Sequence, residues 1–306
     1  MALTLAEGAK LSNDILLQGV VETMVKESPI LQELPFIEIV GNGLTYNQEK
    51  TLPDIDFYDV GDTWAESTPT FEQITANLKI MGGDADVDNF LKATRSNIQD
   101  LEAAVVELKA KALRRKFEET FVYGDSSANA KQFDGLRKLI DTTTASDQVI
   151  AAGATGATLT LSMLDEVIDV VKGGKPDMLL MSRRSRRKIN ALVRAAGGMM
   201  ETDRDKWGNF IQFWDGVPVG INDWILDTHV VSGSVETDTT GGTCSTIYAV
   251  QFGEGALCGL TAPGHLTVEP IGSLEDKDAS RTRIKWYVSL ALFSSIKSAA
   301  LIGVQD

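Results

Sequence analysis

The longest helical pattern in the chain lies between Thr94 and Leu136. Apolar residues recur there every three or four positions, which places them on one face of a helix: Ile98, Leu101, Val105, Leu108 and Ala112. Ser96 followed by Gln99 forms a capping-box start, and Gly124 is expected to end the helix in a left-handed turn. At ~1.5 Å per residue the helix would be about 40 Å long. The pattern therefore predicts a spine around which the rest of the chain is built.

A second helical pattern opens the chain. Thr4 to Glu7 forms a capping box, and an apolar stripe continues through Leu11, Ile15, Leu16, Val20 and Val21. Ser28-Pro29 and Leu34-Pro35 end the pattern, because a residue before proline avoids the helical region. This arm has a narrow stripe and no partner nearby in the sequence. It is expected to dock either on its own body or on a neighbouring subunit, and both interpretations stay open.

Between residues 36 and 90 the pattern changes to that of strands. Residues 36–40 run into Gly41-Asn42-Gly43, which marks a turn, and 44–46 resume as a strand. Residues 71–80 are expected to form the returning strand. The sequence therefore predicts a hairpin whose two strands are joined by a tip over 49–70.

The tip of this hairpin carries six acidic residues and one base, Lys50. A connection of this length is uncommon in a compact domain, and a free loop would not expose aromatic side chains without a reason. We therefore expect an extended hairpin that becomes ordered against another surface. Its candidate inter-subunit contact residues are Asp54, Asp56, Phe57, Tyr58, Asp59, Asp62, Trp64 and Glu66.

Two acidic clusters resemble calcium loops without matching one. They are Asp54, Asp56, Asp59 and Asp62 in the tip, and Asp84, Asp86 and Asp88 beyond it. In the first cluster Tyr58 occupies the place of a third ligand, and in the second Arg95 replaces the terminal glutamate. Strand alternation alone would place the second cluster on one solvated face. We expect no metal site.

After the spine, the chain alternates helices and strands. A helix is expected from Leu161 to Val171, then a buried strand over 178–181, then a second helix with apolar residues Ile189, Leu192, Val193 and Ala196. This second helix has six bases and no acids between Ser182 and Arg194. The bases form either a solvated face or an electrostatic contact with an acidic partner, and both interpretations stay open. Arg183, Arg184 and Arg187 are the contact candidates.

The last third of the chain predicts mainly strands. These are expected at 211–219, 220–226, 247–252, 266–271, 283–290 and 292–304. Residues 232–245 are expected to form a Gly/Ser/Thr loop with little to bury.

Composition limits the possible function classes. The net charge of −14 argues against wholesale coating of nucleic acid, although local basic patches remain possible. The chain has two cysteines, Cys244 and Cys258, and a single disulfide could not stabilise 306 residues, so a reducing compartment fits best. The N-terminal sequence does not resemble a signal peptide, and no run of about 18 apolar residues predicts a membrane span.

The sequence contains no recognisable catalytic arrangement. Its two histidines, His229 and His265, lie in no nucleophile–base or metal-binding pattern. Gly173-Gly174-Lys175-Pro176 lacks the outer residues of a phosphate loop. We expect a protein that is not an enzyme and binds no cofactor. The alternative in another class is an α/β enzyme whose active site would combine the glycine-rich loop near residue 153 with the arginine-rich helix.

The order of these parts resembles that of a known family. An N-terminal arm, an acidic hairpin and a spine are followed by Gly124-Asp125, by Asp134-Gly135-Leu136 and by Gly216-Val217-Pro218-Val219. Taken together, they resemble the major capsid (coat) protein of tailed bacteriophages, with the HK-type coat fold shared with encapsulins. The resemblance implies the α+β class and four parts. These are an N-arm (1–42), an extended loop (43–92), a peripheral domain (93–127 plus 262–292) and an α/β axial domain (128–261 plus 293–306).

The resemblance also implies a function. Members assemble through pentamers and hexamers into an icosahedral shell that encloses double-stranded DNA without sequence-specific binding. It further implies a scaffolding protein, a portal and a decoration protein as partners, and a place in the virion after assembly in the bacterial cytoplasm. The alternative within this class is the shell of an encapsulin compartment.

Overall fold

The computed structural model describes residues 24, 28–51, 55–64, 66–68, 70–95, 101–204 and 210–305. Within these residues, the helices of eight or more residues are α5 (Leu101–Tyr123), α7 (Leu161–Val170) and α8 (Arg183–Ala195). Shorter ones are α3 (Pro29–Glu33), α4 (Asn89–Arg95), α6 (Leu136–Leu139) and the 3-10 turn η1 (Ser295–Lys297). No helix in the described part is long and apolar enough to cross a membrane.

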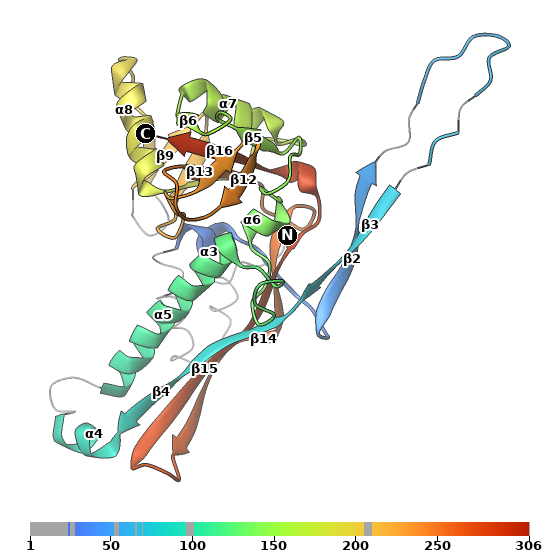
Figure 1. Cartoon of the computed structure of the whole chain (residues 1–306). Coiled ribbons are helices and arrows are strands. Elements are labelled where there is room, and N and C mark those ends of the chain that lie inside the picture. Colours follow the sequence, from blue (N-terminus) through green and yellow to red (C-terminus); the bar gives the residue numbers. More distant parts are fainter. Residues whose placement is uncertain are drawn as a thin grey trace.

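The four-stranded sheet lies along α5, and the larger sheet lies at the C-terminal end of this helix (Figure 1). The four-stranded sheet has the order β1-β14-β15-β4, with bounds Phe36–Glu38, Leu257–Ser273, Ala279–Leu292 and Lys79–Asp88. The other sheet has the order β5-β16-β13-β7-β10-β9-β8, with β6 (Ala157–Thr158) beside β16. Its strands are Val149–Ala151, Ser298–Gln305, Ser245–Val250, Met178–Met181, Val217–Ile221, Phe210–Trp214 and Glu201–Arg204.

The central strands of the larger sheet are buried on both faces, as the continuous apolar run 178–181 predicts. Alternation sends Leu179 and Met181 into a core with α7 and α8, whereas Met178 and Leu180 face a core that includes α5 and α6. The sheet therefore has the pair α7 and α8 on one side and the end of the spine on the other (Figure 1).

The buried face of α5 differs from the predicted one. Leu108 is 64% exposed and Ala112 is also exposed, so the predicted stripe faces solvent there. The buried residues have the same helical spacing but a shifted register: Val106, Ala110, Leu113, Phe117 and Phe121. This second stripe faces the core because it carries the aromatic rings, and burying them removes a larger apolar area from water. The predicted capping box at Ser96 lies outside the described residues.

The rings of the buried α5 stripe organise the core between the spine and the four-stranded sheet. Phe117 lies 4.9 Å from Trp286 of β15, centroid to centroid, and 5.9 Å from Phe133. Phe36 of β1 lies 5.7 Å from the same Trp286. Strands β4 and β15 are joined at the surface as well, because Asp84 pairs with Arg283 and Asp86 with Arg281. These ion pairs satisfy two carboxylates of the second acidic cluster.

The spine ends at a close backbone crossing, and not in the predicted left-handed turn. Gly124 does not adopt a positive φ. A Cβ atom there would collide with the carbonyl oxygens of Phe133 and Thr120, and one on Gly135 would meet the Thr120 oxygen at 2.5 Å. The Gly135 amide donates to the Gly124 carbonyl over 2.8 Å. Both glycines are required because two backbone segments touch at this point.

The predicted hairpin is present as β2 (Gly43–Thr51) and β3 (Thr70–Asn77). Its strands pair from Gly43 with Asn77 to Thr51 with Thr70, and the hairpin projects far from the rest of the chain (Figure 1). The predicted returning strand 71–80 is divided, because β4 begins at Lys79 and joins the four-stranded sheet instead.

Two further predictions need correction. The strand expected at 220–226 ends at Ile221, since Asn222 begins a turn in which its side chain accepts from the Trp224 amide. The loop expected at 232–245 contains most of a small hairpin, β11 (Val230–Ser232) and β12 (Val235–Asp238), and it buries Glu236. A two-residue turn at Asp215 and Gly216, both with positive φ, joins β9 to β10.

Candidate assembly surfaces

The tip of the β2–β3 hairpin exposes apolar side chains that touch little of their own chain. Phe57 is fully exposed, Trp64 is 77% exposed, and Ile55 and Val60 are also exposed. Tyr58 and Trp64 stack with ring centroids 4.5 Å apart, so part of the tip has a defined shape. Exposed apolar groups concentrated at the end of an extension are typical of a surface that binds a partner.

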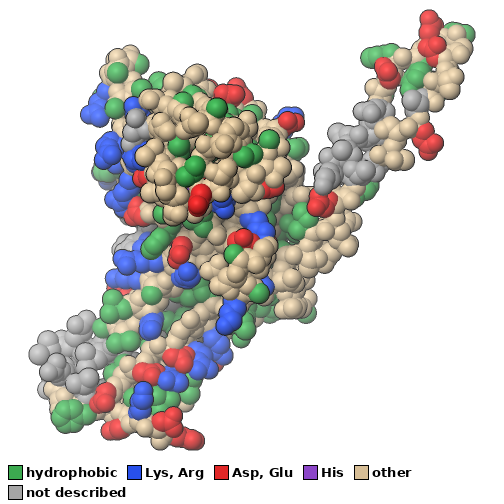
Figure 2. Space-filling model, viewed as in Figure 1, with side chains coloured by type: hydrophobic (Ala, Val, Ile, Leu, Met, Phe, Trp, Pro, Cys, Tyr) green, Lys and Arg blue, Asp and Glu red, His purple; other side chains and the backbone are tan. Residues whose placement is uncertain are grey.

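The acidic residues of the tip partly shape its turn. The Asp59 amide donates to Asp62 Oδ2 over 2.7 Å, and the Asp56 carboxylate accepts from the next amide. Glu66 is exposed, and no Lys or Arg occurs between residues 51 and 78 to balance these charges. Asp54 lies outside the described residues. Figure 2 shows the resulting acidic and apolar end of the hairpin.

The arginine-rich helix α8 lies on the other side of the molecule from the hairpin tip, so the two groups of candidate residues do not meet within one chain (Figure 1). Arg183 forms a bidentate ion pair with Asp223. Arg184 donates to the carbonyl oxygens of Asp227 and Thr243, at 3.2 and 2.6 Å. Arg187 is exposed. Two of the three candidate arginines therefore already have roles inside their own chain.

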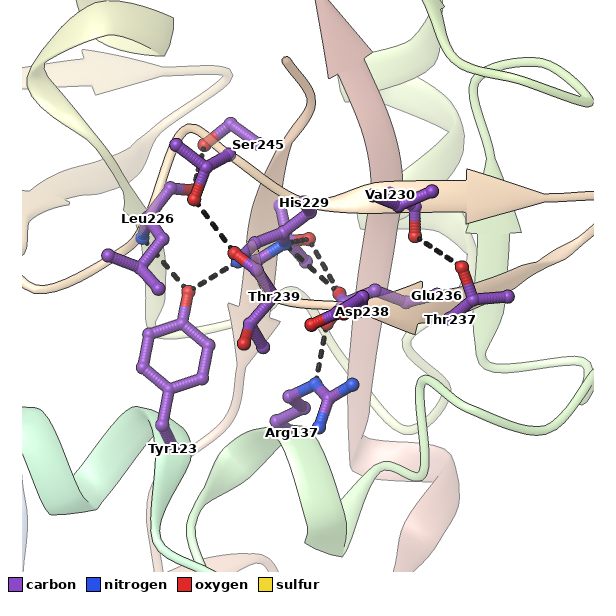
Figure 3. Close-up of polar contacts among 12 residues, drawn as sticks. Tyr123, Arg137, Leu226, His229, Val230, Glu236, Thr237, Asp238, Thr239 and Ser245 are labelled. Atoms are coloured by element: carbon purple, nitrogen blue, oxygen red, sulfur yellow. Dashed lines mark hydrogen bonds and ion pairs between the residues drawn. The ribbon is translucent and has the colours of Figure 1, made fainter. Parts of the chain in front are cut away.

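A buried polar network, which the sequence does not reveal, joins the spine to the larger sheet (Figure 3). His229 Nε2 lies 2.8 Å from the hydroxyl of Tyr123, and His229 Nδ1 lies 3.0 Å from Thr246 Oγ1. The Glu236 carboxylate accepts from Arg137 Nε at 2.5 Å and from Thr246 Oγ1 at 3.1 Å. The side chains of His229 and Glu236 have no exposed surface.

The hydrogen-bond directions in this network agree with one another. The Leu226 amide donates to the Tyr123 oxygen over 2.9 Å, so the Tyr123 hydroxyl can donate to His229 Nε2. His229 then carries its proton on Nδ1, facing Thr246 and Glu236. Burial alone raises the pKa of Glu236, but the hydrogen bonds from His229 and Arg137, with the positive charge of the Arg137 guanidinium, outweigh burial and lower it.

No sequence signal identifies this network. Tyr123 and His229 are 106 positions apart, and Arg137 and Glu236 are 99 apart. Their local contexts are a helix end and a polar loop, with no motif spacing between them. The arrangement contains one histidine, whose neighbours are the hydroxyl groups of Tyr123 and Thr246, and the side chains of His229 and Glu236 are closed to solvent. It satisfies buried polar groups and fixes how three segments cross.

A second polar cluster holds the loop after the spine. Lys138 Nζ lies 2.7 Å from Asp125 and 3.0 Å from Asp134, and the Asp134 side chain accepts from the Ser126 amide. The hydrogen bond from Lys138 lowers the pKa of Asp125. Together with the crossing of Gly124 and Gly135, these contacts give the passage 124–136 a structural explanation.

Comparison with solved structures places the fold in one class. The chain has a TM-score of 0.67 to a chain of the holo-SrpI encapsulin complex from Synechococcus elongatus PCC 7942, with 17% identity over 90% of this chain and 87% of that one. A chain from Microbacterium phage Oxtober96 gives 0.62 and 14%, with 91% of each covered. The capsid of a native GTA particle gives 0.62 and 15%, over 92% and 90%. The fold is the α+β, HK-type coat fold of phage capsids and encapsulins.

Sequence comparison then identifies the family. Residues 18–237 match the family model described as SU10 major capsid protein, and the chain belongs to that family. No curated protein matches the chain. It is thus a major capsid protein of the phage type, a structural component of a virion. The resemblance seen in the sequence is confirmed.

Proposed function

We propose that the chain assembles through pentamers and hexamers into an icosahedral shell around double-stranded DNA. A scaffolding protein, a portal and a decoration protein would be its further partners, and assembly would take place in the cytoplasm of a bacterial host. The proposal extends the family membership, which identifies a capsid protein, to a particular geometry and cargo.

The observation that carries the proposal is the hairpin tip. Exposure of Phe57 and Trp64 to water is unfavourable. Covering them with a neighbouring subunit is favourable by ~25 cal/mol per Å² of apolar area buried. The tip projects away from its own chain, so the covering surface belongs to another subunit (Figure 1). The tip and its binding surface are different patches, and such a contact repeated around an axis closes into rings.

The domain assignment is part of this proposal. The peripheral domain would comprise the spine with the four-stranded sheet, approximately 93–127 plus 262–292. The axial domain would comprise the larger sheet with α7 and α8, approximately 128–261 plus 293–306. Strand β4 pairs with β15 over ten residues, which supports grouping it with the peripheral domain and limiting the extended loop to β2, β3 and their tip.

Particle size and content test the proposal. The full chain, expressed alone and with a scaffolding protein, is sedimented and imaged by negative stain. We expect megadalton shells with five- and six-fold capsomers, and particles from infected cells should contain double-stranded DNA. A small oligomer in every preparation would reject the shell. Native particles that hold a protein cargo and never DNA would favour the encapsulin-type compartment, which the similarity to the Synechococcus structure keeps as the second candidate.

A further inference from the structure

The exposed face of α8 carries more positive charge than the contacts of Arg183 and Arg184 within the chain explain. Five of the six bases lie in the first six residues of the helix, and the first turn has no acidic residue. The positive end of the helix dipole disfavours cations there. Like charges four residues apart, such as Arg183 and Arg187, also destabilise a helix. A sequence that breaks both rules on one short helix indicates a function for the charges.

Two of the exposed cations of α8 lack a carboxylate partner in the described part of the chain. Arg187 and Arg194 are both exposed, and they lie seven residues apart, which is two turns on the same helix face. Arg194 Nε donates only to the Asn190 carbonyl within the helix. Arg183 lies on this face too, but Asp223 balances its charge. We call Arg187 and Arg194 the open pair.

The surroundings of the open pair favour a partner rich in charge and poor in apolar surface. The exposed residue between them is Ala191, and the apolar residues Ile189 and Val193 face the core. Protein interfaces usually bury aromatic or aliphatic anchors at their centre. A neighbour's hairpin tip would bring Phe57 and Trp64 to a helix face on which the methyl group of Ala191 is the exposed apolar group between the two arginines.

The same side of the molecule remains basic beyond α8. Figure 2 shows Lys and Arg side chains along the side that α8 and α5 form, whereas acidic side chains gather at the hairpin tip and at the far end of β14 and β15. The open pair spans about 10 Å along the helix axis, which corresponds to about three phosphates of one DNA strand at ~3.4 Å each. An extended polyanion fits this distribution better than a compact acidic loop.

We propose that the open pair, Arg187 and Arg194, contacts the phosphates of the enclosed DNA, so that α8 lies on the inner wall of the shell. This inference rests on the proposed function. Each contact is weak and independent of sequence, because a phosphate carries no base information. A shell repeats the contact in every subunit, so a weak contact is sufficient to hold the packaged DNA against the wall.

The test measures DNA binding by unassembled full-length subunits, with a 30-base-pair duplex and a series of salt concentrations. Its variant is Arg187→Gln with Arg194→Gln. Loss of two phosphate contacts should reduce the slope of log affinity against log salt by about 1.8, so that between 50 and 200 mM salt the wild type loses about 12-fold more affinity than the variant does. The matched control, Lys131→Gln with Lys277→Gln, removes the same charge from exposed positions on the α5–α6 loop and the β14–β15 turn.

The outcomes separate this inference from the proposed function. A reduced slope in the arginine variant with an unchanged slope in the control supports the inference. Equal slopes in all three proteins, or an equal reduction in variant and control, would overturn it. An unchanged slope together with failed assembly of the arginine variant would assign the open pair to a neighbouring subunit. A wild-type chain that never forms particles would reject the proposed function, whatever the slope.

Discussion

The hydroxyl of Tyr123, at the last position of the spine, lies 2.8 Å from Nε2 of His229, which is fully buried beside the larger sheet. The same oxygen accepts the Leu226 amide. One side chain thus fixes the end of α5 to the segment 226–229, which lies about a hundred positions further along the chain. The orientation of the spine relative to the sheet depends on this contact.

Tyr123→Phe is expected to lower the free energy of unfolding by about 1–3 kcal/mol, because it leaves the buried His229 Nε2 and the Leu226 amide without their partner. Chemical denaturation measures the change. Tyr248→Phe is the matched control, since its buried hydroxyl has no hydrogen-bond partner among the described residues. Removing that group should be neutral or stabilising. Equal losses in both variants would show that the network adds nothing.

Glu236→Gln is expected to destabilise the chain by roughly 3–5 kcal/mol at pH 7, because Arg137 and His229 lose a buried carboxylate. The folded-state pKa of Glu236 lies below its ordinary value of 4.5. Its contribution is therefore complete above pH ~4.5 and is lost as the pH falls through the folded pKa. The difference between wild type and variant should shrink in that range.

Thermal unfolding at several pH values tests this dependence. Glu201→Gln, at an exposed position on β8, serves as the control and should track the wild type throughout. A gap between wild type and Glu236→Gln that stays constant down to pH 3 would contradict the assigned pKa direction.

Gly124→Ala and Gly135→Ala should each cost about 3 kcal/mol or more, since the new methyl group meets backbone oxygens that cannot rotate away. At Gly83 in β4 a Cβ atom would meet only the flexible Lys109 side chain, at 3.9 Å, and φ is ordinary, so Gly83→Ala should change stability little. The thermal midpoints of the three variants, compared with that of the wild type, measure these changes in stability. If either crossing glycine tolerated alanine as well as Gly83 does, the close approach would be wrong.

Phe57→Ala combined with Trp64→Ala should raise the protein concentration needed for assembly while leaving the subunit folded, because both side chains are exposed in the monomer. Light scattering during assembly gives that concentration. Val40→Ala combined with Met199→Ala removes equally exposed apolar groups elsewhere and should have no effect. Equal effects of the two double variants would mean that the tip is not a special contact.

The parts of the fold that the sequence predicts well are those set by local pattern. Alternation and turn residues predict the hairpin, and the continuous apolar run predicts β7. The register of α5 is different, because two stripes with the same spacing compete and only the tertiary contact of Phe117 with Trp286 chooses between them. Gly124 is required by Phe133, nine positions later, and helix-end statistics do not contain that information.

The polar network could not be predicted for a related reason. His229 and Glu236 have ordinary neighbours in sequence, and their partners Tyr123 and Arg137 come from segments that only the fold brings together. The candidate contact residues behave differently. Exposed aromatic residues in a long acidic loop are visible in the sequence because composition alone makes them unusual.

Assembly of a chain without its hairpin tip tests whether the tip joins one subunit to the next. Glu49 and Phe71 are paired residues, so replacing residues 50–70 with Asn-Gly closes β2 and β3 in a two-residue turn. We expect a folded subunit, shown by an unchanged thermal midpoint, that sediments as a monomer or small oligomer under conditions in which the wild type forms shells. Normal shells from this variant would contradict it.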